Sequence, residues 1–166
     1  MVESSQQERL QPCLLDRLTD DEPKKATERV GQAVLSPSEL RQAVVRDLGH
    51  LLNTTNLAAT QDLQRYPLVA QSVLNYGVPA LAGRTISGLD TQALKLALEQ
   101  AIRTFEPRIL PNTLEVRVST ERADRGVGLR MEIEGDLWSQ EVEGGLRLKA
   151  SFDSQSGRFH IDGETS

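Results

Sequence analysis

Residues 90–118 read DTQALKLALEQAIRTFEPRILPNTLEVRV, and the spacing of the apolar residues changes within this stretch. In its first half, apolar side chains recur about every 3.6 residues, which predicts an amphipathic helix. In its last part they alternate with charged side chains, which predicts a strand with one buried face. Asp90 is placed to cap the helix at its start, and Pro107 ends it. The chain therefore changes from helical to extended at Glu106-Pro107-Arg108.

Two further helices are predicted upstream of this stretch. Ser36-Pro37-Ser38-Glu39 has the hydroxyl, proline and glutamate of a capping box in the right order, so a helix is expected from here to about Asn53. Another helical stretch is expected after Tyr66-Pro67, with Gly77 as the left-handed residue at its C-terminal end. The apolar stripe of this second stretch would consist of Val69, Val73 and Leu74.

Downstream, the alternation continues in three more segments, around residues 129–133, 146–152 and 159–161. Strands with one apolar and one charged face are typical of an antiparallel sheet that is covered on one side. The sequence therefore predicts an α+β fold, in which about three helices pack on one face of a small antiparallel sheet that ends in a C-terminal hairpin. One shared core is expected from the residues at the centres of the apolar stripes, namely Leu48, Leu52, Val73, Leu98, Ile102, Val116, Met131 and Leu148.

Residues 1–35 are expected to be a polar leader ahead of a single domain over residues 36–166. The leader contains one apolar cluster, in which Leu14 and Leu18 share a face if the segment is helical, with Leu15 beside them. Two interpretations remain open. The segment is a frayed tail that packs on its own domain, or it is a short docking helix that becomes ordered on a partner.

The composition argues against several classes of function. A net charge of −5, with acidic and basic residues mixed along 166 residues, argues against nucleic-acid binding, which needs a concentrated basic surface. Cys13 is the only cysteine and there are two histidines, so no disulfide and no metal site are expected. No apolar run approaches the ~18 residues needed to cross a bilayer, so a cytoplasmic protein without membrane insertion is expected. Nucleotide-binding and serine-hydrolase motifs are missing, so neither a cofactor nor a small-molecule ligand is expected.

Glu106-Pro107-Arg108 departs from the local rules for helix ends. A carboxylate at a helix C-terminus meets the negative end of the helix dipole, which costs roughly 0.3–1 kcal/mol. If the chain beyond is extended, Glu106 and Arg108 project to the same side. The two side chains then either form a local ion pair that offsets the penalty or bind complementary groups on another chain. The residues alone leave both interpretations open.

A glycoside hydrolase is the enzymatic alternative, because it needs two carboxylates that face each other across a cleft. Glu106 would have to pair with Glu132, Glu134, Glu141 or Glu143 for this purpose. The alternating acidic residues are more simply explained as solvated strand faces, so no catalytic residue is predicted.

Several segments of the chain resemble the TssE family, the baseplate subunits of type VI secretion systems. This family is related to the small wedge and sheath-initiator subunit of contractile phage baseplates. The most specific similarity combines Ser72-Val73-Leu74-Asn75-Tyr76-Gly77 with Phe105-Glu106-Pro107-Arg108-Ile109. Shorter matches are Leu14-Leu15-Asp16-Arg17-Leu18-Thr19, Arg46-Asp47-Leu48, Leu51-Leu52-Asn53-Thr54, Tyr66-Pro67, Leu81-Ala82-Gly83 and Leu137-Trp138.

The resemblance implies a structural subunit that is not an enzyme, links the wedge core to the contractile sheath and helps to initiate sheath assembly. The implied partners are the wedge subunits TssF, TssG and TssK and the sheath subunits TssB and TssC. The implied location is cytoplasmic, within the baseplate at the inner face of the cell envelope. The family has also been called lysozyme-like, which keeps a peptidoglycan muramidase as the alternative function.

The resemblance also implies where partners bind. Glu106, Pro107 and Arg108 are expected to engage the wedge core, and substitutions of Glu106 or Arg108 are expected to leave the fold intact. A neighbouring subunit is expected to contact Leu14, Leu15 and Leu18. Strand addition by the sheath is expected at the C-terminal hairpin, at Arg158 and His160. The charged residues Arg147 and Lys149 of this hairpin either prevent edge pairing or select the partner strand.

Overall fold

The computed structural model describes residues 13–18, 36–81, 88–123, 126–138, 145–153 and 156–164. Its helices are α1 (Leu14–Leu18), α2 (Pro37–Leu52), α3 (Pro67–Ala70) and α4 (Thr91–Phe105), with 3-10 turns η1 (Leu57–Ala59) and η2 (Val73–Asn75). The strands are β1 (Glu115–Ala123), β2 (Gly126–Gly135), β3 (Leu146–Asp153) and β4 (Arg158–Glu164). The expectations for the rest of the leader, for residues 82–87 and for Glu141 and Glu143 lie outside the described residues.

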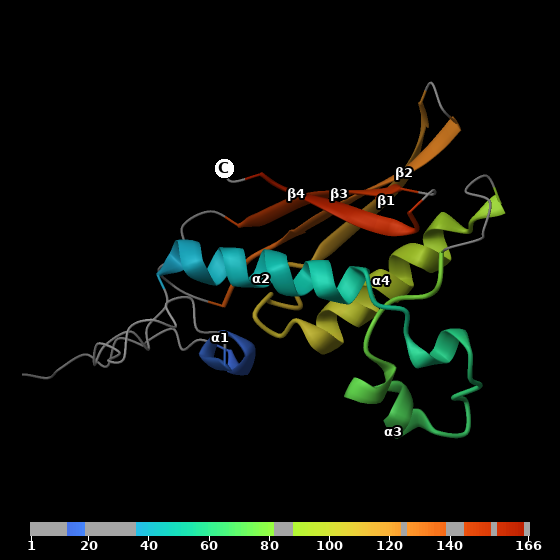
Figure 1. The fold of residues 1–166 in the computed structure, drawn as a ribbon, viewed down its shortest axis with the longest axis horizontal. Helices are drawn as coiled ribbons and strands as arrows, with labels where there is room; N and C mark the ends of the chain where they lie inside the picture. Colours follow the sequence, from blue (N-terminus) through green and yellow to red (C-terminus); the bar gives the residue numbers. More distant parts are fainter. Residues whose placement is uncertain are drawn as a thin grey trace, which may run out of the picture.

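The helices and the sheet form two layers. The strands pair in the order β1-β2-β3-β4, and each neighbouring pair is antiparallel. Figure 1 shows α2 and α4 side by side on one face of this sheet, with α3 farther from it. The predicted α+β fold with a C-terminal hairpin is therefore confirmed.

The two long helices begin where the sequence predicts. The Ser36 hydroxyl accepts a hydrogen bond from the Glu39 amide at 3.3 Å, and the Glu39 carboxylate accepts one from the Ser36 amide at 2.7 Å. This reciprocal pair satisfies two backbone donors at the start of α2, as a capping box should. At the start of α4, Asp90 Oδ1 accepts hydrogen bonds from the Gln92 and Ala93 amides, both at 3.0 Å.

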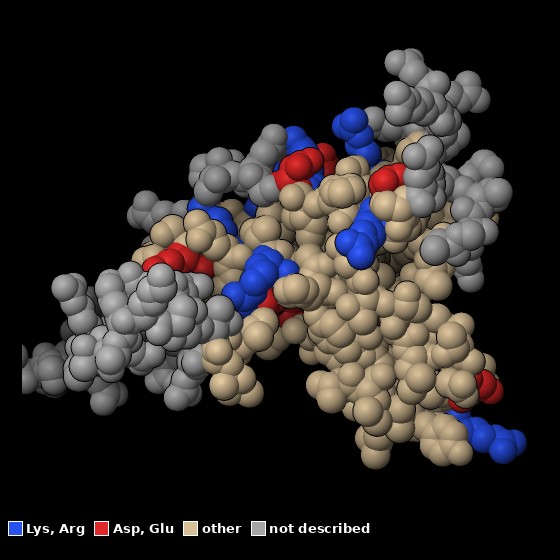
Figure 2. All heavy atoms as spheres, viewed as in Figure 1, with Lys and Arg blue, Asp and Glu red and all other residues tan. Residues whose placement is uncertain are grey.

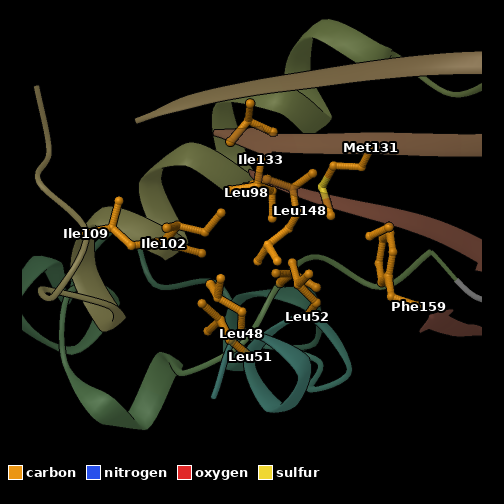
Figure 3. Close-up of a cluster of buried hydrophobic side chains, with 14 of the residues drawn as sticks. Leu48, Leu51, Leu52, Leu98, Ile102, Ile109, Met131, Ile133, Leu148 and Phe159 are labelled. Atoms are coloured by element: carbon orange, nitrogen blue, oxygen red, sulfur yellow. The ribbon is translucent and has the colours of Figure 1, made fainter. Parts of the chain in front are cut away.

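The core lies between the two long helices and the inner face of the sheet. Figure 3 shows leucines of α2 pointing toward side chains of the strands, with Leu98 and Ile102 of α4 beside them. Seven of the eight predicted core residues are buried: Leu48, Leu52, Leu98, Ile102, Val116, Met131 and Leu148. The alternating burial along β3 confirms the predicted inner and outer faces of this strand.

The eighth predicted core residue, Val73, is not in the core, because its side chain is 78% exposed. The expected helix after Tyr66-Pro67 is instead divided into α3 and η2. The side chain of Ser72 is the physical cause of this division. Its hydroxyl donates to the Val69 carbonyl at 3.0 Å and accepts from the Leu74 amide at 3.2 Å. Such side-chain bonds compete with the backbone hydrogen bonds of a continuous helix. The expected apolar stripe of Val69, Val73 and Leu74 therefore does not form on one helix face.

Gly77 ends this segment with a positive φ of 120°, in accord with the left-handed residue that the sequence predicts there. A Cβ at this position would collide with the Thr54 carbonyl, so the close approach also requires glycine. The chain then returns to the end of α2, where the Val78 amide donates to the Thr54 carbonyl at 2.8 Å. We call residues 57–77, which are anchored by this return, the apolar lobe.

The burial difference between Leu98 and Val73 gives a direct test of the packing. We expect Leu98→Ala to lower the free energy of unfolding by roughly 2–5 kcal/mol, because it leaves a cavity in the core. Val73→Ala is the control and should change stability little, since the valine is exposed. Chemical denaturation of both variants measures the difference. Equal losses of stability would contradict this description of the core.

Candidate functional site

The candidate site is built around the carboxylate of Glu106, which follows the last residue of α4. Its side chain is only 3% exposed. Arg108 approaches it with two parallel hydrogen bonds, from Nε to Oε1 at 2.6 Å and from Nη2 to Oε2 at 2.5 Å. The Arg108 amide also donates to Oε1, at 3.3 Å. Glu106 is thus the C-cap of α4. Its carboxylate also accepts the hydrogen bonds of Arg108, which hold the turn after α4 closed.

Arg108 connects this turn to α2. Its Nη2 also donates to Asp47 Oδ2 at 2.6 Å. Burial lowers the pKa of the Arg108 guanidinium, but the hydrogen bonds and charges of Glu106 and Asp47 outweigh burial and raise that pKa above its ordinary value. The guanidinium therefore remains charged and is held between two carboxylates. Its Nη1 is buried and has no acceptor among the residues that the structure describes.

The cluster continues from Asp47 to α1. Asp47 Oδ1 accepts a hydrogen bond from Arg46 Nε at 2.9 Å, and Arg46 Nη1 pairs with Asp16 Oδ1 at 2.7 Å. Asp16 Oδ2 accepts the amide of Cys13 at 3.0 Å, which closes the first turn of α1. We call these five side chains, Asp16, Arg46, Asp47, Glu106 and Arg108, the ion-pair cluster. It joins α1, α2 and the end of α4.

α1 therefore contacts its own domain through a polar side chain and exposes its leucines. Leu14 and Leu18 are among the most exposed apolar residues of the described chain, and Leu15 is about half exposed. The Asp16–Arg46 ion pair connects this helix to α2, while the leucine side chains are exposed. Figure 1 shows α1 beneath α2, away from the sheet.

Two residues beside the cluster add aromatic surface. Tyr76 packs edge to face against Phe105 with ring centroids 5.2 Å apart. Burial raises the pKa of the Tyr76 hydroxyl, and the negative charges of Asp47 and Glu106 raise it further, so the phenol stays protonated. Trp138 donates its amide to the Arg108 carbonyl at 2.7 Å while its side chain is largely exposed. Aromatic and arginine side chains are the residues that most often dominate binding energy at protein interfaces.

Arg158 and His160 lie elsewhere, on β4 at one edge of the sheet. The structure changes the expectation for their backbone groups. Asn53 accepts the Phe159 amide at 2.8 Å and donates to the Phe159 carbonyl at 3.0 Å, so these two groups of Phe159 point away from β3. Because backbone direction alternates along a strand, the amides of Arg158 and His160 point toward β3 and are not open to another strand.

The same alternation identifies the open positions of β4. The outward-facing backbone groups beyond Phe159 are those of Ile161 and Gly163. Asn53 already occupies the outward groups of Phe159, so this asparagine limits how far an added strand could extend along the edge. The side chains of Arg158 and His160 are exposed and remain available for polar contacts.

The described carboxylates that were considered for a glycoside hydrolase, Glu106, Glu132 and Glu134, do not meet. Glu132 and Glu134 lie on the outer face of the sheet, opposite the buried Met131 and Ile133, whereas Glu106 is buried at the end of α4. Glu134 pairs there with Arg147 at 2.9 Å. Within the described ranges, no group of His, Cys, Asp and Glu side chains is arranged to hold a metal ion. None of the described helices has the length and apolar character to cross a membrane.

Sequence reasoning missed Asp47, although a signal was present. Asp47 falls on the apolar stripe of α2, four residues after Ala43 and four before Leu51, both of which are buried. A carboxylate on a buried stripe requires a cation nearby, and Arg108 supplies it. Asn53 gave no such signal, because its contact with Phe159 joins positions 106 residues apart.

The comparison with known proteins identifies one family. A family model described as "Baseplate wedge protein gp25" matches residues 38–142. The match covers more than half of the chain and includes α2, α4, β1 and β2 together with Glu106-Pro107-Arg108. No curated protein and no solved structure was found to match.

The burial of Glu106 leads us to expect that its carboxylate is essential for stability, which differs from the expectation from the sequence that its substitution leaves the fold intact. Glu106→Ala removes one partner of a buried ion pair and should lower the free energy of unfolding by roughly 3–5 kcal/mol. Glu115→Ala is a matched control, since Glu115 forms the same two-residue-spaced pair with Arg117 but is 52% exposed. This control should show little change. Similar unfolding curves for both variants would contradict the role given to Glu106.

The attachment of α1 should depend on pH in a defined direction. Burial raises the pKa of the Asp16 carboxyl, but hydrogen bonds from Cys13 and Arg46 outweigh burial and hold that pKa below its ordinary value. The attachment should thus be complete above the ordinary carboxyl pKa and be lost as the pH falls through the lowered one. An NMR titration of the Cys13 amide should show this midpoint, and Asp16→Asn should abolish it. A midpoint at or above the ordinary carboxyl pKa would show that Asp16 is not paired.

Proposed function

We propose that this chain, which belongs to the baseplate wedge protein gp25 family, serves as the TssE-type subunit of a type VI secretion baseplate. In this role it is a structural component that links the wedge core to the contractile sheath and helps to start sheath assembly. The observation that carries the proposal is the family match across the segment that contains Glu106 and Arg108. The partners on the wedge side would be TssF, TssG and TssK, and those on the sheath side TssB and TssC. Its place would be the cytoplasmic side of the cell envelope.

Arg108 is the residue best suited to contact the wedge core. Glu106 and Asp47 fix the orientation of its guanidinium, so little conformational entropy would be lost on binding. Its Nη1 has no acceptor among the described residues, and a buried donor without an acceptor costs roughly 1–3 kcal/mol. A partner that gives this nitrogen an acceptor after a small rearrangement would remove that cost. Glu106 would then act as the positioning residue, with Pro107 exposed between the two charged side chains.

The leader would supply a second contact through α1. Its leucines, Leu14, Leu15 and Leu18, are presented on the side away from the Asp16–Arg46 pair and are exposed in the isolated chain. Apolar side chains on a short helix fit a groove on a neighbouring subunit.

The environment of Glu106 favours a structural role over a muramidase activity. A general acid in a glycoside hydrolase needs a carboxyl group that can hold and release a proton next to the sugar. The carboxylate of Glu106 is instead committed to Arg108 through two hydrogen bonds, and the two described strand carboxylates face the opposite side of the sheet.

Co-purification tests the wedge contact. Arg108→Lys keeps the positive charge but removes the planar fork, so recovery of co-expressed TssF and TssG should fall at least about tenfold. Arg103→Lys is the control, because Arg103 is exposed in the last turn of α4, five residues before Arg108. Melting temperatures of both variants establish that each is folded. Undiminished recovery of the wedge subunits with a folded Arg108→Lys variant would refute the assigned contact.

The sheath contact is proposed at the open part of β4, with Arg158 and His160 contributing their side chains. Gly163→Pro removes a backbone donor that faces away from β3, so it should block strand addition and leave the fold in place. Gly163→Ala keeps the donor and is the matched control. Sheath assembly on baseplates that contain each variant is the measurement. Normal assembly with the folded proline variant would show that the sheath does not pair with this edge.

A further inference from the structure

The apolar lobe carries a concentration of exposed apolar side chains that neither the fold nor the ion-pair cluster explains. Four large residues within a nine-residue stretch are exposed, namely Tyr66 at 60%, Leu68 at 84%, Val73 at 78% and Leu74 at 67%. Single exposed apolar residues are normal on a soluble protein, but a contiguous group of them marks a contact surface.

Beyond Asp62 and Arg65, the lobe also lacks charge. Residues 66–83 contain no Asp, Glu, Lys or Arg, although charged residues make up 26% of the chain. Figure 2 shows the surface over α3 without either charge colour, with charged side chains only at its outer end. The centre of a protein interface is depleted of charged residues and enriched in aromatic ones, whereas its rim is polar. The lobe has this composition.

The backbone of the lobe, which carries these exposed side chains, is held in place by hydrogen bonds. The Asn75 side chain accepts the Ala58 amide from η1 and donates to the Ala70 carbonyl of α3, both at 2.9 Å. The backbone bonds of Val78, which donates to the Thr54 carbonyl and accepts from the Asn56 amide, hold the base of the lobe against the end of α2. Polar contacts thus shape the backbone while the apolar side chains remain outside. Such preorganisation lowers the entropic cost of binding.

The size and position of the lobe indicate which kind of partner it fits. A stable interface takes about 20–30 residues on each side, so four side chains cannot hold a second copy of this chain by themselves. The lobe is instead continuous with the ion-pair cluster, because Tyr76 at its end packs on Phe105, the residue before Glu106. A partner that reaches Arg108 can therefore cover the lobe as part of one larger contact.

We infer that the apolar lobe binds an uncharged, apolar face of the same wedge-core partner that engages Arg108. This inference rests on the proposed function and extends the contact from the ion-pair cluster to Tyr66, Leu68, Val73 and Leu74. A charged partner surface does not fit this part of the lobe, since its charges would lose water and residues 66–77 contain no counter-ion for them.

The test is a double variant, Leu68→Gln with Leu74→Gln, against the control Leu96→Gln, an exposed leucine on α4. Recovery of co-expressed wedge subunits should fall at least about tenfold with the double variant, because two apolar side chains lose their burial. The control should bind as the wild type does. Melting temperatures should be unchanged. A photo-reactive amino acid at position 74 gives a second readout and should cross-link to a wedge subunit.

The outcomes separate this inference from the proposed function. If the double variant binds normally and position 74 does not cross-link, the lobe is not an interface, while the wedge role stands. If the wild-type chain recovers no wedge subunit, both fail. Sedimentation as a dimer that the double variant abolishes would assign the lobe to a second copy and overturn the inference. Binding to neutral lipid vesicles that the double variant abolishes would assign it to a membrane and do the same.

Discussion

The buried ion pair of Glu106 and Arg108 fixes the turn through which the chain passes from the helical layer to the sheet. A carboxylate at the end of α4 is unfavourable by itself, because it faces the negative end of the helix dipole and is withdrawn from water. Arg108 offsets both effects and thereby fixes the turn. The next residues then pair with the end of β2, through the Leu110 amide and the Asp136 carbonyl at 2.8 Å. Asp47 extends the same constraint to α2.

The proposed contact residue Arg108 also takes part in the ion pairs that stabilise the fold. A partner that contacts Arg108 contacts a group whose position is set by α2 and α4 together, so its orientation on the domain is defined by the fold itself. The exposed Trp138 is attached to the same turn through its amide. By contrast, the pair of Glu115 and Arg117 has the same sequence spacing but lies on an exposed strand face, where Arg117 also pairs with Glu132 and Glu134 of the neighbouring β2. Exposed pairs of this kind contribute little to stability.

The sequence predicted the parts of the fold that periodicity controls. The apolar stripes of α2 and α4 and the alternation in the strands follow from burial against a common core, so they could be recognised without the structure. The segment after Tyr66 could not, because its course is determined by side-chain bonds from Ser72 and Asn75 rather than by burial. Glu106 and Arg108 were identifiable as an unusual pair, but their burial depends on Asp47, which arrives from a distant helix.

The bond between Asn53 and Phe159 has a consequence for how the chain acquires its fold. The four strands follow one another in sequence order, so each hairpin forms from neighbouring segments. The attachment of β4 to the end of α2 joins residues 106 positions apart and requires closure of a long loop. Contacts of high sequence separation slow folding, so the helical layer and the last strand should lock together late. Until that step, the outward groups of Phe159 would lack their partner Asn53, and this edge of the sheet would be open to incorrect pairing.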